Sequence, residues 1–323
     1  MMRRFFAIIY ALLTLLTLNS CNHKKLCMEH PHMAPLRLVF DWRDAPEAEP
    51  DGMCVFFYPE QGGQPRRFDF NNRTGGSISL AVGRYRVICY NNDTERVYFG
   101  NTDNYLLHSV YSPTTDLFAP LGLTSKAGVV PRADDEERVV STPDMMWGCS
   151  VEIIEVPDCV EGEAEERVIT LYPHKLVRNY TLRVLNCSGL KYASQMCGSL
   201  YGMSPGIKFD GEKPFAENVT IPFECYVLDD TTIEAKFLTF GHNADVCKPH
   251  RAVLYIWMKD GKIYCYGLES EKFDLTTQVH NAPDPYNVYL EIDGLDLPKP
   301  ISNGSGFVPD VDDWVEIEGD INL

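Results

Sequence analysis

The chain has 323 residues, 45% of them apolar and 23% charged, and its formal charge is −17. This length allows two domains with a core each, and the apolar and aromatic content is too high for a disordered chain. The acidic balance excludes a nucleic-acid partner, because binding to a phosphate backbone requires clustered Lys and Arg.

Residues 1–20 predict a lipoprotein signal peptide. Arg3 and Arg4 precede the apolar run Phe5–Leu18, which is too short for the roughly 20 residues that span a bilayer. The following sequence Leu-Asn-Ser-Cys ends at Cys21 and resembles a bacterial lipobox. This resemblance implies that Cys21 carries a diacylglycerol thioether and becomes the mature N-terminus, whereas the plainer alternative is a cleaved signal with an incidental thiol.

Loss of residues 1–20 leaves 303 residues with 27 basic and 46 acidic side chains, a formal charge of −19. Acyl chains would then hold an anionic body at a membrane that its charge alone does not favour. Residues 21–35 predict a lipidated tether, because they show no hydrophobic period and contain two prolines. Four potential ligands in this tether match no closed zinc pattern, and a solvated linker is the preferred interpretation; they are His23, Cys27, His30 and His32.

From residue 36 the pattern predicts short strands separated by turns. Met53–Tyr58 is apolar on both faces, as expected of a strand in the middle of a sandwich. Residues 100–145 are interrupted by prolines and predict long loops with a short helix around Tyr105–Val110. The other strands predicted before residue 173 are 77–82, 84–90, 150–156 and 167–172, the last two forming a hairpin with a solvated acidic tip.

The second half continues this pattern, and a domain boundary is expected near Tyr172 and Pro173. The strands 252–258 and 262–268 flank Asp260-Gly261, which predicts a hairpin with a type I′ turn. The remaining predicted strands are 178–186, 286–292 and 314–317. The prediction is an all-β protein with two tandem β-sandwich domains, 36–172 and 173–323.

The lipobox, followed by MCVFFYPEQGG and by GGSISLAVGRYRVICYNNDTERVYF, resembles the N-terminal half of the fimbrillin-related lipoproteins of Bacteroidales. The stretches LYPHKLVRNYTLRVLN, GSLYGM and FLTFGH resemble the second half of the same group. The resemblance implies two transthyretin-like, Greek-key β-sandwiches and a role as a pilus subunit or fimbrillin-like adhesin at the outer membrane and cell surface. Its implied partners are other fimbrial subunits, the outer membrane through lipid, and a host or glycan ligand.

In that group, subunits polymerise by strand donation, which satisfies the unpaired backbone groups of an open sheet edge. Stalk and tip subunits lose their first strand when a protease cuts after Arg or Lys, whereas anchor subunits keep lipid and strand. Four arginines of the N-terminal region are candidates, and none is singled out: Arg37, Arg43, Arg66 and Arg67. The segment Trp314–Leu323 is either a donor strand or an ordinary edge strand, and the stalk, tip and anchor roles stay open.

The sequence favours a non-enzymatic protein without cofactor or metal. It contains no G-x-S-x-G, P-loop, G-x-G-x-x-G or H-E-x-x-H motif, and a secreted hydrolase has no other support. The acidic groups 134–137 and 310–313 are interpreted as solvated surface, with calcium as the weaker alternative for the second group.

The eleven cysteines and a mid-chain cluster are candidates for disulfide bonds or metal ligation. Cys149 with Cys159, or Cys187 with Cys197, could pair outside the cytoplasm. Mostly reduced, buried thiols are the preferred interpretation, because several cysteines lie in apolar strands. The cluster of His242, Cys247 and His250 lacks a fourth ligand nearby and is interpreted as a loop without metal.

A surface glycan-binding lipoprotein is the alternative function. Aromatic side chains in the loops could stack on sugars, although such rings are more often buried. The aromatic residues concerned are Tyr105, Tyr111, Trp147 and Tyr201.

Overall fold

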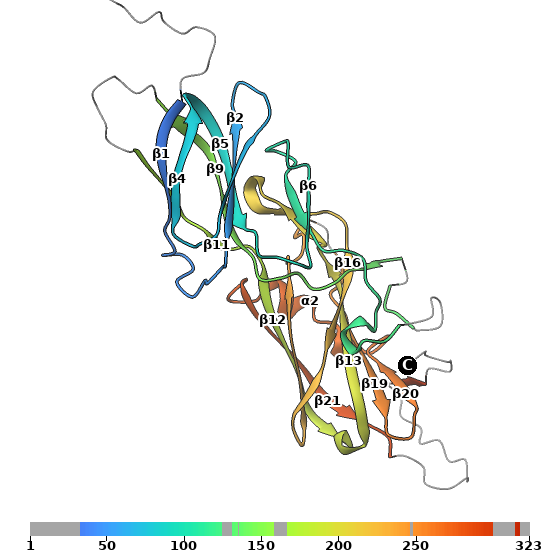
Figure 1. The fold of residues 1–323 in the computed structure, drawn as a ribbon. Coiled ribbons are helices and arrows are strands. Elements are labelled where there is room, and N and C mark those ends of the chain that lie inside the picture. The colour runs from blue at the N-terminus through green and yellow to red at the C-terminus, as the bar shows by residue number, and fades with distance from the viewer. Residues whose placement is uncertain are drawn as a thin grey trace, which may run out of the picture.

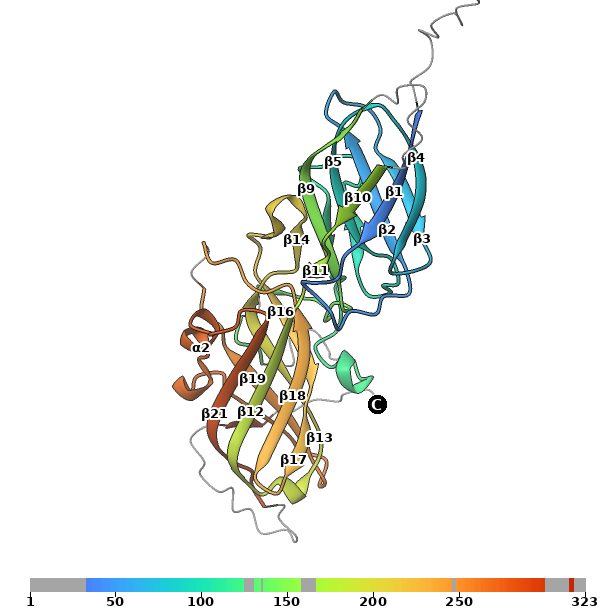
Figure 2. The ribbon, with the colours of Figure 1, turned by 90° about the vertical axis from the view of Figure 1, so that its left-hand side faces the viewer.

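The structure, a computed structural model, describes residues 33–124, 131–134, 136–157, 167–245 and 248–299 and the backbone of 314–316. These residues form mostly β-strands, with one short α-helix, α2 (Thr276–His280), which confirms the predicted all-β class. The molecule is elongated, with the strands of its two halves at opposite ends (Figures 1 and 2). No helix within the described ranges is long and apolar enough to cross a membrane.

Two sheets form a sandwich in the N-terminal half. A three-stranded sheet joins, in spatial order, β10 (Arg167–Leu171), β1 (Met33–Phe40) and β4 (Gly75–Ala81). A five-stranded sheet joins β11 (His174–Lys175), β9 (Trp147–Val156), β5 (Gly83–Asn91), β2 (Met53–Pro59) and β3 (Arg66–Phe70). Apolar side chains of both sheets enclose one core, as in sheet-on-sheet packing.

Strand β2 has an apolar residue at every position from Met53 to Tyr58 because both of its faces are buried. Its odd-numbered residues, Met53 to Phe57, belong to the core between the two sheets. Its even-numbered residues, Cys54 to Tyr58, belong to a second core on the opposite face of the five-stranded sheet. Successive side chains of a strand point to opposite faces, so the prediction of a strand buried on both sides is confirmed.

Two larger sheets form the C-terminal half. The four-stranded sheet joins β17 (Tyr226–Asp229), β18 (Thr232–Thr239), β12 (Arg178–Ser188) and β21 (Asn287–Asp296). The six-stranded sheet joins β22 (Trp314–Glu316), β20 (Ile263–Tyr266), β19 (Ala252–Met258), β13 (Ala193–Met203), β16 (Val219–Glu224) and β8 (Arg138–Val139). The core between these sheets contains Tyr180, Leu182 and Val184 of β12, the three residues that the alternation placed on one face.

A segment from the first half of the chain covers the outer face of the six-stranded sheet. Phe118 and Val139 belong to one apolar cluster with Tyr255 and Trp257 of β19. The ring centroid of Phe118 lies 5.2 Å from that of Tyr255 and 4.9 Å from that of Trp257, both edge to face. Residues before position 173 thus pack on a sheet of the second half. The domain limits 36–172 and 173–323 stay a prediction.

The two halves share a sheet and a buried core where they meet. The shared sheet joins β15 (Lys213–Pro214), β14 (Gly206–Lys208), β7 (Ser109–Tyr111) and β6 (Tyr98–Gly100), so β14 of the second half pairs with β7 of the first.

The second core, which includes Phe56, Tyr90 and Phe209, lies at this junction and is called the junction core below. His108 is fully buried among these rings. Its Nδ1 lies 2.5 Å from the Tyr58 hydroxyl oxygen, and its ring centroid lies 5.0 Å from that of Phe209. Phe209 in turn stacks on Tyr90 at 4.9 Å. Burial lowers the pKa of His108 to about 4, so the imidazole is neutral at neutral pH and joins the halves without a buried charge.

Glu234 ties the edge strand β17 to its sheet. The carboxylate is almost completely buried and accepts hydrogen bonds from Arg183 Nε at 2.8 Å and from the Tyr226 hydroxyl, and it pairs with Lys236 Nζ at 2.9 Å. These contacts, led by the Tyr226 hydroxyl and Lys236, lower the pKa of Glu234 to about 2. The carboxylate thus links three adjacent strands.

Two predicted local elements are wrong. The strands near 150–156 and 167–172 do not form a hairpin, because β9 pairs with β5 while β10 pairs in parallel with β1 in the opposite sheet. Burial of Leu171 in the core between the sheets accounts for this placement. The predicted helix at 105–110 is a single turn at Asn104–His108 that ends where β7 begins, because the buried contacts of His108 fix the chain there.

The predicted hairpin around Asp260-Gly261 is confirmed, with a different turn. Trp257 pairs with Ile263, and the Met258 N–H donates to the Lys262 carbonyl, which leaves a three-residue loop. Within this loop, residues 259–261, only Gly261 has a positive φ, at 87°. A type I′ turn needs positive φ at both central residues, whereas a three-residue loop needs it only at the last position.

Candidate functional site

Strand β1 is the first described element and starts at Met33, within the predicted tether. Its alternating residues Ala34, Leu36, Leu38 and Phe40 are buried in the core of the first half. The strand pairs in parallel with β10 and antiparallel with β4, so it occupies the centre of its sheet. Removal of β1 would leave two strand edges unpaired along an apolar groove, which is a template for another strand.

The four candidate arginines differ in their position relative to β1. Arg37 lies within the strand, and Arg66 and Arg67 lie on β3. Arg43 lies in the turn directly after β1, where its exposed guanidinium stands 4.8 Å from the ring centroid of Tyr172. A cut after Arg43 is therefore the one among the four that would release the whole of β1 and nothing beyond the turn.

The lipid attachment predicted at Cys21 lies outside the described residues and stays a prediction. The tether residues His23, Cys27, His30 and His32 also lie outside them.

At the other end of the chain, β22 pairs antiparallel with β20 at the edge of the six-stranded sheet. Residues 314–316 thus occupy an edge strand within the chain, and the rest of the predicted donor segment, 317–323, lies outside the described residues.

A second exposed edge is β17. Its residues Tyr226, Val227 and Leu228 have 40%, 46% and 47% of their surface exposed, and among the described strands β17 pairs with β18 alone. Three consecutive exposed apolar residues on an edge strand favour contact with another chain.

The aromatic side chains proposed for glycan binding do not form a surface platform. Tyr105 and Tyr201 are buried, and Tyr111 and Trp147 are partly buried. Tyr105 belongs to the junction core and Tyr201 to the cluster on the outer face of the six-stranded sheet.

The first acidic group is only partly a solvated surface. Asp134 pairs with Lys248 Nζ at 3.1 Å. Glu137 is buried, and its Oε2 accepts hydrogen bonds from the Gly202 N–H at 3.2 Å and the Thr220 hydroxyl at 3.1 Å. Burial raises the pKa of Glu137. The prediction of a solvated position is therefore wrong for Glu137, while Asp135 and 310–313 lie outside the described residues.

The cysteines of the described ranges are buried and reduced. None of these seven is bonded in a disulfide, so the Cys187–Cys197 pairing is wrong, and Cys159 lies outside the described residues. Sγ of Cys89 lies 3.2 Å from Sγ of Cys149 on the neighbouring strand. The seven are Cys54, Cys89, Cys149, Cys187, Cys197, Cys225 and Cys265.

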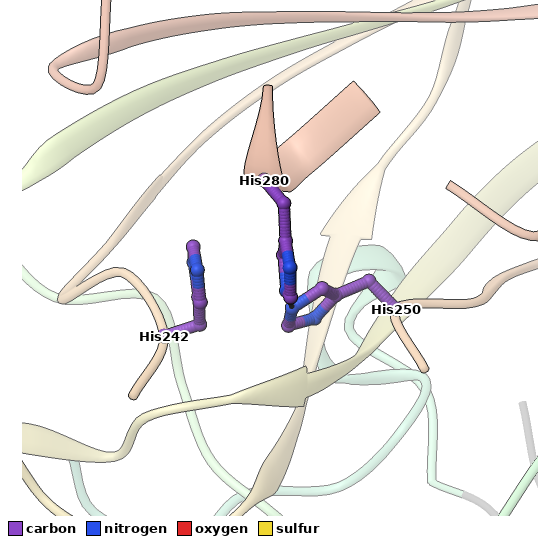
Figure 3. Close-up of side chains that lie close together, drawn as sticks. All are labelled: His242, His250 and His280. Carbon is purple, nitrogen blue, oxygen red and sulfur yellow. Dashed lines mark hydrogen bonds between the residues drawn. The ribbon is translucent and has the colours of Figure 1, made fainter. Parts of the chain in front are cut away.

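Three histidines from separate segments meet beside α2 (Figure 3). His242 follows β18, His250 precedes β19, and His280 ends α2. Their ring nitrogens approach within 4.8 Å of one another, and Nε2 of His250 lies 3.1 Å from Nε2 of His280. The sequence pattern groups His242 with His250 but gives no sign of His280. Cys247, the third member of the predicted cluster, lies outside the described residues.

His242, His250 and His280 are called the histidine cluster below. Burial is the main cause of the lowered pKa values of His242 and His250. It lowers the pKa of His242 to about 4, with the neighbouring cations and imidazoles adding to the effect, and it lowers the pKa of His250. Both rings are neutral at neutral pH, so each has one ring nitrogen without a hydrogen.

A model of the family described as "Domain of unknown function (DUF5119)" matches residues 20–224. The "Putative fimbrium anchoring subunit Fim4B" of Bacteroides ovatus is 23% identical over 240 residues, which are 74% of this chain and 66% of that protein. The chain thus spans slightly less than two thirds of this curated relative.

Two solved structures share the fold. A "putative adhesin" from Bacteroides ovatus superposes with a TM-score of 0.62 at 19% identity, covering 88% of this chain and 98% of that one. A protein from Bacteroides thetaiotaomicron, described among "putative polysaccharide binding proteins (DUF1812)", superposes with a TM-score of 0.51 at 10% identity, covering 80% and 90%.

Proposed function

The chain belongs to the DUF5119 family, and from this membership and the similarity to a fimbrium anchoring subunit we propose that it is a lipid-anchored, non-enzymatic subunit of a cell-surface fimbrium. The proposal includes acylation at Cys21, attachment to the outer membrane, two β-sandwich domains divided near Tyr172, and assembly by strand donation.

The position of β1 carries the proposal. The strand fills the groove between β10 and β4 with its own buried residues, so a chain that keeps β1 has no vacancy there for the strand of another subunit. Cys21 precedes β1 in the sequence, so a cut after Arg43 would remove lipid and strand together. A lipidated chain therefore has a closed groove, and we assign it to the base of the fibre as an anchor.

An anchor of this kind meets its neighbour elsewhere on its surface. The C-terminal segment 314–323 would serve as the donor strand. It would leave its place beside β20 and enter the groove of the next subunit. Donation of this kind replaces one set of backbone hydrogen bonds by another and buries the alternate side chains of the strand.

The experiment is to isolate the surface form from cells and determine its N-terminus and intact mass, for the wild type and for Cys21→Ala. An acylated chain starting at Cys21, and release of Cys21→Ala from the membrane fraction, are expected. Cys27→Ala, in the same tether, is the matched control and should stay membrane-bound. A surface form that begins after Arg43 would refute the anchor role, and membrane retention of Cys21→Ala would refute lipid attachment.

Glycan binding is the second candidate. A hollow on the outer face of the four-stranded sheet is lined by Asn179, Lys236, Asn287 and Tyr289, and Tyr289 is 72% exposed. An exposed ring beside amide side chains suits a sugar. Binding of the untrimmed monomer to a glycan array, lost in Tyr289→Ala, would support this function, whereas equal binding by that variant would argue against this hollow.

A further inference from the structure

We infer that His242, His250 and His280 form a binding site for one divalent transition-metal ion, with zinc as the expected occupant. The site is independent of the proposed fimbrial role. It joins the loop after β18, the segment before β19 and the end of α2, three places separated in the sequence but adjacent in the C-terminal half.

Two of the three imidazoles already stand near a coordinating separation. Two nitrogen ligands at about 2.0–2.1 Å from a tetrahedral zinc lie roughly 3.3 Å apart, and the two Nε2 atoms of His250 and His280 lie 3.1 Å apart. The His242 ring is stacked parallel to that of His280, with centroids 4.8 Å apart (Figure 3). Coordination requires the His242 ring to turn so that a nitrogen points at the space between the other two.

The surroundings of His250 fix it in the form that a metal needs. Its Nδ1 lies 3.2 Å from the Tyr201 carbonyl oxygen and donates its hydrogen there, which leaves the lone pair of Nε2 facing His280. Metal-bound histidines are commonly oriented by such a second hydrogen bond. The His250 N–H also donates to Thr276 Oγ1 at 2.8 Å, and the His250 carbonyl accepts from the Leu275 N–H at 2.7 Å. These bonds tie His250 to the start of the helix that carries His280.

A second observation concerns a ring nitrogen of His242. Within the described part of the chain, its Nδ1 is buried without a hydrogen-bond partner. Leaving such an atom unpaired is unfavourable, because it has lost its hydrogen bonds to water. A hydrogen bond between His280 and His250 accounts for those two rings without a metal, but it leaves this nitrogen of His242 unexplained.

The ligand type selects the class of metal. Three imidazole ligands suit zinc, copper or nickel, whereas calcium and magnesium prefer oxygen ligands. Three protein ligands leave a fourth position of a tetrahedral ion open to water or to a group from another molecule.

The test is to titrate Zn²⁺ into the untagged full chain, freed of metal with EDTA, while calorimetry measures affinity and elemental analysis measures stoichiometry. One zinc per chain and a rise in Tm with added zinc are expected. His280→Ala should fold normally, since His280 is exposed, and should bind at least about 100-fold more weakly.

His174→Ala is the matched control, because His174 is not one of the three clustered histidines and pairs with Glu212 at 2.7 Å. The zinc affinity of this variant should equal that of the wild type. Circular dichroism of each variant separates loss of ligand from loss of fold. The inference is overturned if the wild type binds no stoichiometric zinc, or if His280→Ala and His242→Ala bind zinc as tightly as the wild type does, which would place the ion on other residues.

Discussion

Replacement of Leu38 by alanine should measure how firmly β1 is held in its groove. Leu38 lies on β1, between β10 and β4, and its side chain is fully buried in the core between the two sheets. The substitution removes three carbons, worth about 0.8 kcal/mol each in transfer free energy, or about 2.4 kcal/mol. The cavity that remains raises the loss in free energy of unfolding to about 3–5 kcal/mol, equivalent to roughly 6–12 °C in Tm for the lower value.

Urea unfolding followed by circular dichroism, with calorimetry for Tm, measures this loss. Val168→Ala on the neighbouring β10 is the control, because Val168 is 58% exposed and its truncation should change the free energy of unfolding by no more than about 0.5 kcal/mol. If Leu38→Ala were as mild as the control, β1 would not be packed as described, and the argument that it closes the groove would fail.

Three further predictions follow from the core and the sheet face. Phe209→Ala should lower the free energy of unfolding by about 3–5 kcal/mol and split the calorimetric transition, because the ring fills the junction core; one unsplit transition at the wild-type Tm would contradict this. Glu234 has a lowered pKa when folded, so its stabilisation is complete above its unfolded pKa and is lost as pH falls from about 4.5 towards 2; Glu234→Gln should flatten this decline in acid unfolding curves, and an unchanged slope would count against it. Buried thiols such as Cys197 and Cys225 should resist alkylation until urea unfolds the chain, as read by peptide mass spectrometry, and native-state labelling at the unfolded rate would disprove their burial.

The sequence predicted which face of a strand is buried better than it predicted which strands pair with each other. The period of two in β12 and the continuous apolar run of β2 specify which side chains are buried, because a strand exposes alternate residues to opposite faces. The same pattern says nothing of which strand lies alongside, so β10 was expected beside β9 and lies beside β1 instead. Non-local pairing is decided by how both sheets close over the core.

The histidine cluster shows the same limit for a site. His242 and His250 are close in sequence, so the pattern groups them. His280 is thirty positions from His250 and reaches it only because α2 docks beside the start of β19. The burial of His108 and Glu137 was also beyond sequence reasoning, since both depend on contacts between distant segments. A lone polar residue in a loop gives no local signal of such contacts.

The orientation of β1 has a mechanical consequence. The strand begins at Met33, at the end of the molecule away from the C-terminal sheets, and runs towards them (Figure 1). A pull on its first residue, opposed by the C-terminal half, is directed along the strand, while the hydrogen bonds to β4 lie across it. Tension would therefore act on these hydrogen bonds in shear, so that all of them bear the force together. They would not break one after another from one end. Such a geometry resists detachment of β1 under a steady pull, such as the drag of flowing liquid.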